Sequence, residues 1–176
     1  KQRRLRTTGM PSTIPTNSPV AKLHDLLAKM FNLVDEQLAS ALNAAFLGDV
    51  TLARAVQKSD NNVDLMEIEV DRAAREILAI EGLADEERRL VITSIKVNTD
   101  LERIGDHAKN IAKQVRADMP LPRDLFGEMA DAARAILYDA QDALTMRDQE
   151  IARNVLDYER KVNQLHHAVV KSAVIQ

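Results

Sequence analysis

Apolar residues recur every three or four positions along most of this 176-residue chain, which is the spacing of an amphipathic α-helix rather than of a strand. The first such stretch opens at Ser18-Pro19, because serine is a favoured N-cap and proline suits the first helical turn. It closes at Gly48. One stripe runs along it: Leu23, Leu26, Leu27, Met30, Val34, Leu38, Ala41 and Ala45. The pattern therefore predicts one long helix between Ser18 and Gly48.

Four further helices follow from the same spacing and from the places where it is interrupted. We expect them over about 50–80, from about 84 to the break at Pro120 and Pro122, over 123–146 and over 149–175. Gly82 should end the second of the five helices. Long helices joined by short loops pack antiparallel to their neighbours, so we predict an all-α, up-and-down bundle.

The second and third predicted helices each carry an apolar stripe on one face. In the second helix this stripe is Leu52, Val56, Val63, Met66, Val70, Ala74 and Ile77. In the third helix it is Val91, Ile95, Val97, Leu101, Ile104, Ala108, Ile111 and Val115.

The chain also repeats itself, because residues 31–65 align without a gap with residues 130–164, which lie 99 positions further on. Eight of these 35 positions are identical, a score that amphipathic helices of similar composition can reach by chance. A turn at Asp49 and at Asp148 falls at the same point of both copies, which favours a true repeat. The fold expected is therefore two tandem three-helix bundles, the second of them lacking its last helix.

This repeat sets the expected organisation of the chain. Residues 18–118 should form the first three-helix repeat, and residues 122–176 a partial second repeat of two helices. The place of the missing helix is either empty because the helix was cut away or filled by another molecule. The unpaired apolar face of such a half-built bundle favours a homodimer.

Composition narrows the possible chemistry. Hydrophobic residues make up 45% of the chain but aromatic residues only 3%, so the core consists of aliphatic side chains, which favour helix. The chain has no cysteine, which excludes a disulfide framework, a thiol nucleophile and a thiolate metal site. A net charge of −3 gives no general attraction to nucleic acid.

The first residues differ from the rest in being polar and basic. The sequence begins KQRRLR, and residues 1–17 contain Pro11 and Pro15, so we expect a disordered basic N-terminal segment. An arm that touches anionic lipid, or one that follows directly on a membrane segment, is the alternative. No run approaches the roughly 18 apolar residues that span a bilayer, so no membrane span is predicted. The chain does not begin with methionine, which leaves open that it is a fragment.

The third predicted helix carries the most informative motif, DLERIGDHAKNIA, from Asp100 to Ala112. Glu102 and Asp106 are four residues apart, so both carboxylates lie on one helical face. Such a like-charge pair destabilises a helix by roughly 0.2–0.5 kcal/mol unless a cation or a basic side chain lies between the two groups. Gly105 adds a cost of about 1 kcal/mol relative to alanine. These two costs inside one helix indicate a function.

The second predicted helix carries a matching acidic stripe, formed by Asp60, Asp64, Glu67 and Asp71. Because the second and third helices should run antiparallel, both acidic sets could face one external groove. Their oxygens would suit Mg²⁺, Mn²⁺, Fe or Ca²⁺. The candidate metal ligands are therefore Asp60, Asp64, Glu67, Glu102 and Asp106, with His107 beside the site. The alternative is an ordinary solvated surface on both helices.

The second copy of the repeat departs from this pattern. Glu159, Asn163 and His166 stand where Asp60, Asp64 and Glu67 stand in the first, with His167 beside them. Histidine is a competent ligand for Fe or Zn, although solvated histidines are the simpler interpretation.

Other chemistries find little support in the sequence. There is no glycine-rich phosphate loop and no nucleophile–base pair. A metal-dependent hydrolase would need a pocket with an open coordination position, for which no residues stand out. We therefore expect no enzyme.

The motif residues resemble a known family. DLERIGDHAKNIA, preceded by Arg89 and LVITSIK, is similar to the PhoU family of phosphate-uptake regulators, and DNNVDLMEIEVD is similar to that family's acidic second-helix segment. The likeness covers about residues 20–175. It implies a cytoplasmic, non-enzymatic helical protein that acts with the phosphate ABC transporter and its sensor histidine kinase. Its role would be negative regulation of phosphate uptake and of the phosphate-starvation response.

The resemblance also implies a metal ion, with iron as the first expectation and Mg, Mn, Zn or Ca as alternatives. Some family members bind iron or other metal clusters through motifs that fall here on Asp60 with Asp64 and on Glu102 with Asp106. Two departures weaken parts of the likeness, because LADEER before Arg89 lacks the family's proline and residues 159–163 read ExxxN. A structural scaffold and the cytoplasmic PhoU-like tail of a sodium/phosphate symporter are the alternative functions.

Overall fold

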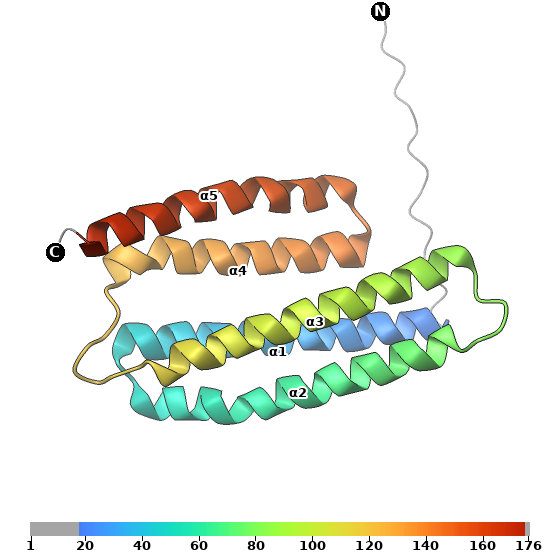
Figure 1. Cartoon of the computed structure of the whole chain (residues 1–176), viewed down its shortest axis with the longest axis horizontal. Coiled ribbons are helices and arrows are strands. Elements are labelled where there is room, and N and C mark those ends of the chain that lie inside the picture. Colours follow the sequence, from blue (N-terminus) through green and yellow to red (C-terminus); the bar gives the residue numbers. More distant parts are fainter. Residues whose placement is uncertain (1–17, 175–176) are drawn as a thin grey trace, which may run out of the picture.

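The computed structural model describes residues 18–174, apart from the side chains at positions 157, 159, 161 and 172–174. Five α-helices make up this range (Figure 1): α1 Pro19–Leu47, α2 Val50–Leu78, α3 Asp85–Lys113, α4 Arg123–Met146 and α5 Gln149–Val174. The predicted all-α fold is confirmed. The basic segment expected over residues 1–17 lies outside the described residues, as does position 175.

The helix ends depend on local capping, much as the sequence indicates. The Ser18 side chain accepts a hydrogen bond from the Ala21 N–H, and Asp49 caps α2 by accepting from two N–H groups at 2.9 Å. Asp148 caps α5 in the same way, at 2.7 and 3.2 Å. Just before these turns, Gly48 and Arg147 both adopt a left-handed conformation, with φ of 64° and 53°. Both copies of the repeat therefore share one turn geometry.

Two helices end earlier than expected. α2 stops at Leu78, and Gly82, with φ of 77°, lies in the following loop rather than at the helix terminus. α3 stops at Lys113, several residues before the two prolines. Gly82 and the two prolines therefore mark positions that the helices do not reach, because each loop begins several residues earlier.

α1, α2 and α3 pack against one another as a three-helix bundle. Every residue of the predicted α1 stripe is buried. Within α3 the buried positions are Val91, Ser94, Asn98, Leu101, Gly105, Ala108 and Ala112. The predicted α3 stripe was therefore partly wrong, because small and polar residues fill the seam between α1 and α2. Five stripe members flank that seam and are only partly buried: Ile95, Val97, Ile104, Ile111 and Val115.

α4 and α5 form a hairpin whose main contact with the three-helix bundle is made with α1, which runs antiparallel to α4 (Figure 1). At the seam, the Arg134 guanidinium donates to both carboxylate oxygens of Asp35 at 2.9 and 2.8 Å. The Tyr138 hydroxyl donates to Asp35 at 2.6 Å. Asp35 and Arg134 are 99 positions apart, so the two copies of the repeat meet at equivalent residues that carry opposite charges. In residues 18–174 no helix is long and apolar enough to cross a membrane.

Candidate functional site

The acidic residues of α2 and α3 come together on one face of the bundle, as the antiparallel packing predicts. Burial raises the pKa of Glu102, and the negative charges of Asp106, Asp64 and Glu67 raise it further. These charges act on Glu102 because the carboxylates of Asp106, Asp64 and Glu67 lie near it. We call these four residues the acidic face: Asp64 and Glu67 from α2, and Glu102 and Asp106 from α3.

Asp60 does not belong to this exposed face. Its residue is only 2% exposed, and one carboxylate oxygen accepts a hydrogen bond from Gln37 Nε2 of α1 at 3.0 Å. The other oxygen forms an ion pair with the Lys109 ammonium of α3. The expected place of Asp60 on a solvent-facing stripe was wrong, because α2 packs against both α1 and α3 and therefore buries a wider arc than a helix with one neighbour.

Lys109 links this buried position to the acidic face. Its ammonium lies 3.7 Å from Asp106 Oδ1 as well as against Asp60. The contact with Asp60 raises the pKa of Lys109 against the effect of its partial desolvation, and the charges of Asp60, Asp106 and Asp64 add to the rise. Lys109 is therefore the basic side chain that relieves repulsion at this end of the α2–α3 groove.

Gly105 has a packing role. A Cβ at this position would lie 3.0 Å from Gln37 Oε1 and 3.1 Å from Val63 Cγ1, both of which are closer than ordinary contacts. Glycine therefore allows α3 to approach α1 and α2 directly over the buried Asp60–Gln37 pair. The cost of glycine in the helix, which we took as a sign of function, has this structural explanation.

Two further polar side chains lie in the same seam. Asn98 Nδ2 donates to the backbone carbonyl of Glu67 at 3.0 Å, and Ser94 is buried one turn earlier. Sequence reasoning missed Gln37, Asn98 and Lys109. Periodicity contained a signal for the first two, because Gln37 falls between apolar positions of α1 and Asn98 continues the three-and-four spacing of the true α3 seam.

The remaining predicted site residues lie apart from this arrangement. Asp71 pairs with Arg75 of its own helix at 2.6 Å, and His107 is exposed. In the second repeat Asn163, His166 and His167 are exposed, while the side chain of Glu159 lies outside the described residues. The exposure of these three side chains therefore gives no support to a second metal site on α5.

The negative charge of the acidic face favours cation binding, but its carboxylates do not form a preorganised metal site. Carboxylate oxygens are the ligands that hard cations prefer, and a bound cation would relieve the repulsion around Glu102. Within the described residues, however, no three His, Asp or Glu side chains converge closely enough to hold a metal ion as they stand. The acidic face therefore offers negative charge to a cation without a formed site, whereas the buried Asp60 end is already occupied by Lys109.

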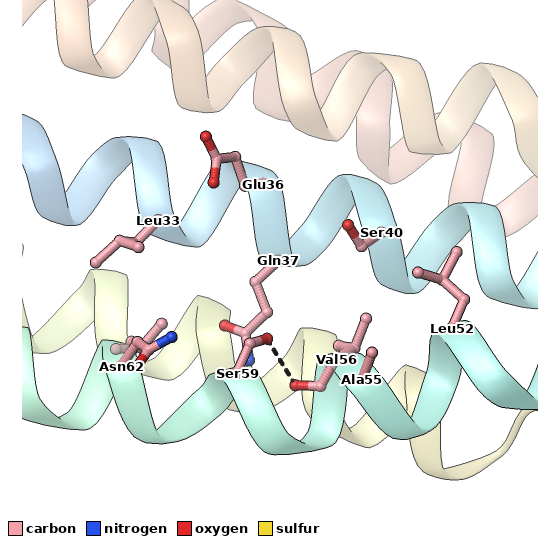
Figure 2. Close-up of a pocket in the computed structure, with 10 residues that line it drawn as sticks. Leu33, Glu36, Gln37, Ser40, Leu52, Ala55, Val56, Ser59 and Asn62 are labelled. Atoms are coloured by element: carbon pink, nitrogen blue, oxygen red, sulfur yellow. Dashed lines mark hydrogen bonds between the residues drawn. The ribbon is translucent and has the colours of Figure 1, made fainter.

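Two hollows on the surface lie away from the acidic face. A pocket of about 270 Å³ opens between α1 and α2, where Gln37 extends from α1 toward α2 and Ser59 donates to the Val56 carbonyl (Figure 2). The second, which we call the open groove, has a volume of about 300 Å³. It is lined by Val97, Ala140, Ala143, Leu144, Ala152 and Val155, which come from α3, α4 and α5.

Comparison with known proteins gives a consistent result. The sequence model of the PhoU domain matches residues 27–115 and 126–176. The crystal structure of PhoU from Pseudomonas aeruginosa superimposes with a TM-score of 0.84 at 26% identity, over 92% of this chain and 79% of that one.

Sequence relatives point the same way. A phosphate-specific transport system accessory protein PhoU homolog of Zymomonas mobilis is 30% identical over 149 residues, which are 82% of this chain and 63% of the relative. The accessory protein PhoU of Escherichia coli is 28% identical over 160 residues, which are 88% of this chain and 66% of the relative. The chain thus spans slightly less than two thirds of the length of these two relatives.

Proposed function

The chain belongs to the PhoU family, and we propose that it acts as an accessory protein of phosphate transport that restrains phosphate uptake and phosphate-starvation signalling. The observation that carries the proposal is the structural likeness to PhoU of Pseudomonas aeruginosa, which extends over 92% of the chain and both repeats. The protein acts in the cytoplasm and without catalysis, through contacts between its helix faces and other proteins.

Its partners, in this proposal, are the ATPase of the phosphate transporter and the sensor histidine kinase. The exposed side of α2 supports a docking role, because Leu65 and Ile68 are 66% and 58% exposed and follow Asp64 and Glu67 directly in the sequence. Exposed apolar side chains next to charges are typical of surfaces that bind another protein.

Deletion of the gene tests the regulatory claim. Transcripts of phosphate-starvation genes should rise in phosphate-rich medium, and the wild-type gene should return them to their basal level. Complementation with Leu65→Ser/Ile68→Ser should fail, whereas Leu47→Ser, which alters a 74% exposed residue at the end of α1, should succeed. Unchanged transcripts in the deletion strain would contradict the regulatory role.

We also propose that the acidic face binds a metal ion, iron first, with Mn, Mg, Zn and Ca as alternatives. Asp64, Glu67, Glu102 and Asp106 would hold it, with Asp60 behind them. The bound ion would neutralise these carboxylates and keep α2 and α3 in one relative position. The raised pKa of Glu102, whose causes after burial are three neighbouring carboxylates, supports this assignment.

Elemental analysis of protein purified without chelator tests the metal assignment. Wild-type protein should retain metal, and Asp64→Ala with Asp106→Ala should lose it. A plain scaffold with solvated acidic residues predicts no bound transition metal in either protein. Equal metal content in the two proteins would show that the acidic face is not the site.

The proposal includes self-association through the open groove. Its alanine and valine side chains are apolar and only partly covered, so a second copy of the chain would bury them. Light scattering should give a dimer mass for the wild-type chain. Ala143→Glu should give a monomer mass, and a monomeric wild-type chain would rule out this interface.

A further inference from the structure

The Asp60–Lys109 pair is the most deeply enclosed charge pair among the described residues. The Asp60 side chain is 3% exposed and that of Lys109 is 29% exposed. The carboxylate belongs to α2, the ammonium to α3, and the amide of Gln37 that completes the contact belongs to α1. All three helices of the first bundle therefore contribute to this one cluster.

A buried carboxylate in this position needs a positive partner. The Gln37 amide is neutral and donates to one oxygen of Asp60, which leaves the second oxygen to Lys109. Removing one member of a buried pair leaves an uncompensated charge and strongly destabilises a fold. Lys109 is therefore expected to support the packing of α2 against α3, and not merely to add charge to the surface.

The same ammonium also reaches the exposed carboxylates. It lies 3.7 Å from Asp106 Oδ1, so one cation bridges an acidic residue of α2 and one of α3. A divalent ion on these two carboxylates would do the same, because it too would neutralise both groups and connect the two helices. The ammonium and a metal ion cannot occupy this one position together, since their charges repel.

We propose that Lys109 is a built-in counter-cation that takes the place of a metal ion between Asp60 and Asp106. The inference has two parts, and only one of them rests on the proposed metal function: that a metal ion is held by the acidic face and not by Asp60. The other part, that the buried end of the groove is stable without metal, rests only on the contacts of Asp60 with Lys109 and Gln37.

The experiment measures thermal unfolding of wild-type protein, Lys109→Met and Lys113→Met, each in EDTA and in Mn²⁺. Lys113 is a matched control, because it lies one turn further along α3, is exposed and carries the same charge. In EDTA, Lys109→Met should lower Tm by roughly 5–15 °C, and Lys113→Met by less than about 2 °C. Mn²⁺ should restore at least half of the loss in Lys109→Met.

A double variant keeps the proposal testable if Lys109→Met does not fold. Asp60→Asn with Lys109→Met removes both charges, while the amide oxygen introduced at position 60 can still accept a hydrogen bond from Gln37. It should recover most of the lost Tm in EDTA and show a smaller response to Mn²⁺ than Lys109→Met. A double variant as unstable as Lys109→Met would overturn the proposal, since the loss would not come from an unpaired Asp60.

Two other outcomes would overturn the inference, and both differ from a failure of the proposed function. If Lys109→Met matches Lys113→Met in EDTA, Lys109 is not a structural counter-cation. If Lys109→Met is unstable but Mn²⁺ does not stabilise it more than wild type, the ammonium does not stand in a metal position. Failure of the proposed metal function instead appears as wild-type protein that carries no metal, whatever the variants do.

Discussion

The two copies of the repeat carry the same apolar pattern but bury it to different degrees. In the first copy Ala41, Ala44, Ala53 and Val56 are at most 2% exposed. Their counterparts in the second copy are Ala140, Ala143, Ala152 and Val155, and all four line the open groove. The difference arises from α3, whose Ala108 and Ala112 pack into the cluster of the first copy. The hydrophobic pattern indicates which helix surface can be buried, and packing of a third helix, α3 in the first copy, determines whether it is buried.

The largest difference in the effect of equivalent substitutions on stability should come from Gly105 of α3 and Gly127 of α4. Gly105→Ala places a methyl group against Gln37 and Val63 and should destabilise the protein by about 1–3 kcal/mol, despite the better helix propensity of alanine. Gly127→Ala meets only an Arg123 side-chain carbon at 3.4 Å and should stabilise it by up to about 1 kcal/mol. Urea unfolding measures both effects. Equal signs for the two variants would contradict the close approach of α3.

A smaller contrast should separate equivalent valines of the two copies. Val56→Ala opens a cavity in the closed core and should cost about 1–2 kcal/mol, since each buried methylene contributes roughly 0.8 kcal/mol. Val155→Ala alters a wall of the open groove and should cost less than about 0.5 kcal/mol. Chemical denaturation of the two variants, compared with wild type, tests this. An equal cost would mean that the groove is covered in solution.

The seam between the copies should contribute an effect of intermediate size. A double-mutant cycle with Asp35→Asn and Arg134→Gln should give a coupling energy of about 1 kcal/mol, because the pair is bidentate but partly exposed. The exposed Arg75–Asp71 pair within α2 is a control and should give about 0.3 kcal/mol.

The same seam predicts a dependence on pH. Burial tends to raise the pKa of Asp35, but the hydrogen bonds from Arg134 and Tyr138 and the Arg134 charge outweigh it and lower that pKa below 3.8. The stabilisation by Asp35 is therefore complete above pH 3.8 and is lost as the pH falls through the lower pKa of the folded state. Asp35→Asn should reduce this acid-induced loss, and an unchanged profile would contradict the assignment.

A substitution in the acidic face should give the smallest change in stability, and it should stabilise the protein rather than destabilise it. Because the pKa of Glu102 is raised in the folded state, its ionised form disfavours folding above that pKa, and the penalty disappears as the pH falls toward the unfolded value. Glu102→Gln should therefore stabilise metal-free protein at neutral pH by about 0.2–0.5 kcal/mol, the size of a like-charge pair one turn apart. The control is Glu128→Gln at an exposed position of α4, which should change stability less.

The sequence alone determined the parts of this protein that depend on neighbouring residues. Ser18 caps the first helix as predicted, and the 99-residue repeat correctly identifies the two equivalent turns at Asp49 and Asp148. These features follow from backbone hydrogen bonds and helical periodicity, which act over a few residues. The approach of acidic residues of α2 and α3 to one another also followed from antiparallel packing, and the charges of Asp64 and Glu67 on α2 accordingly raise the pKa of Glu102 on α3.

Only the tertiary structure decided which polar residues are buried and what they contact. Asp60 belongs to the same acidic stripe as Asp64, yet it lies in the bundle while Asp64 stays exposed. Lys109 becomes its partner because Gly105 lets α3 approach closely, and Asp35 meets its own repeat counterpart, Arg134, because α1 and α4 pack antiparallel. The physical reason is that a helix face is defined by its neighbours, and the neighbours are set by packing between distant segments of the chain.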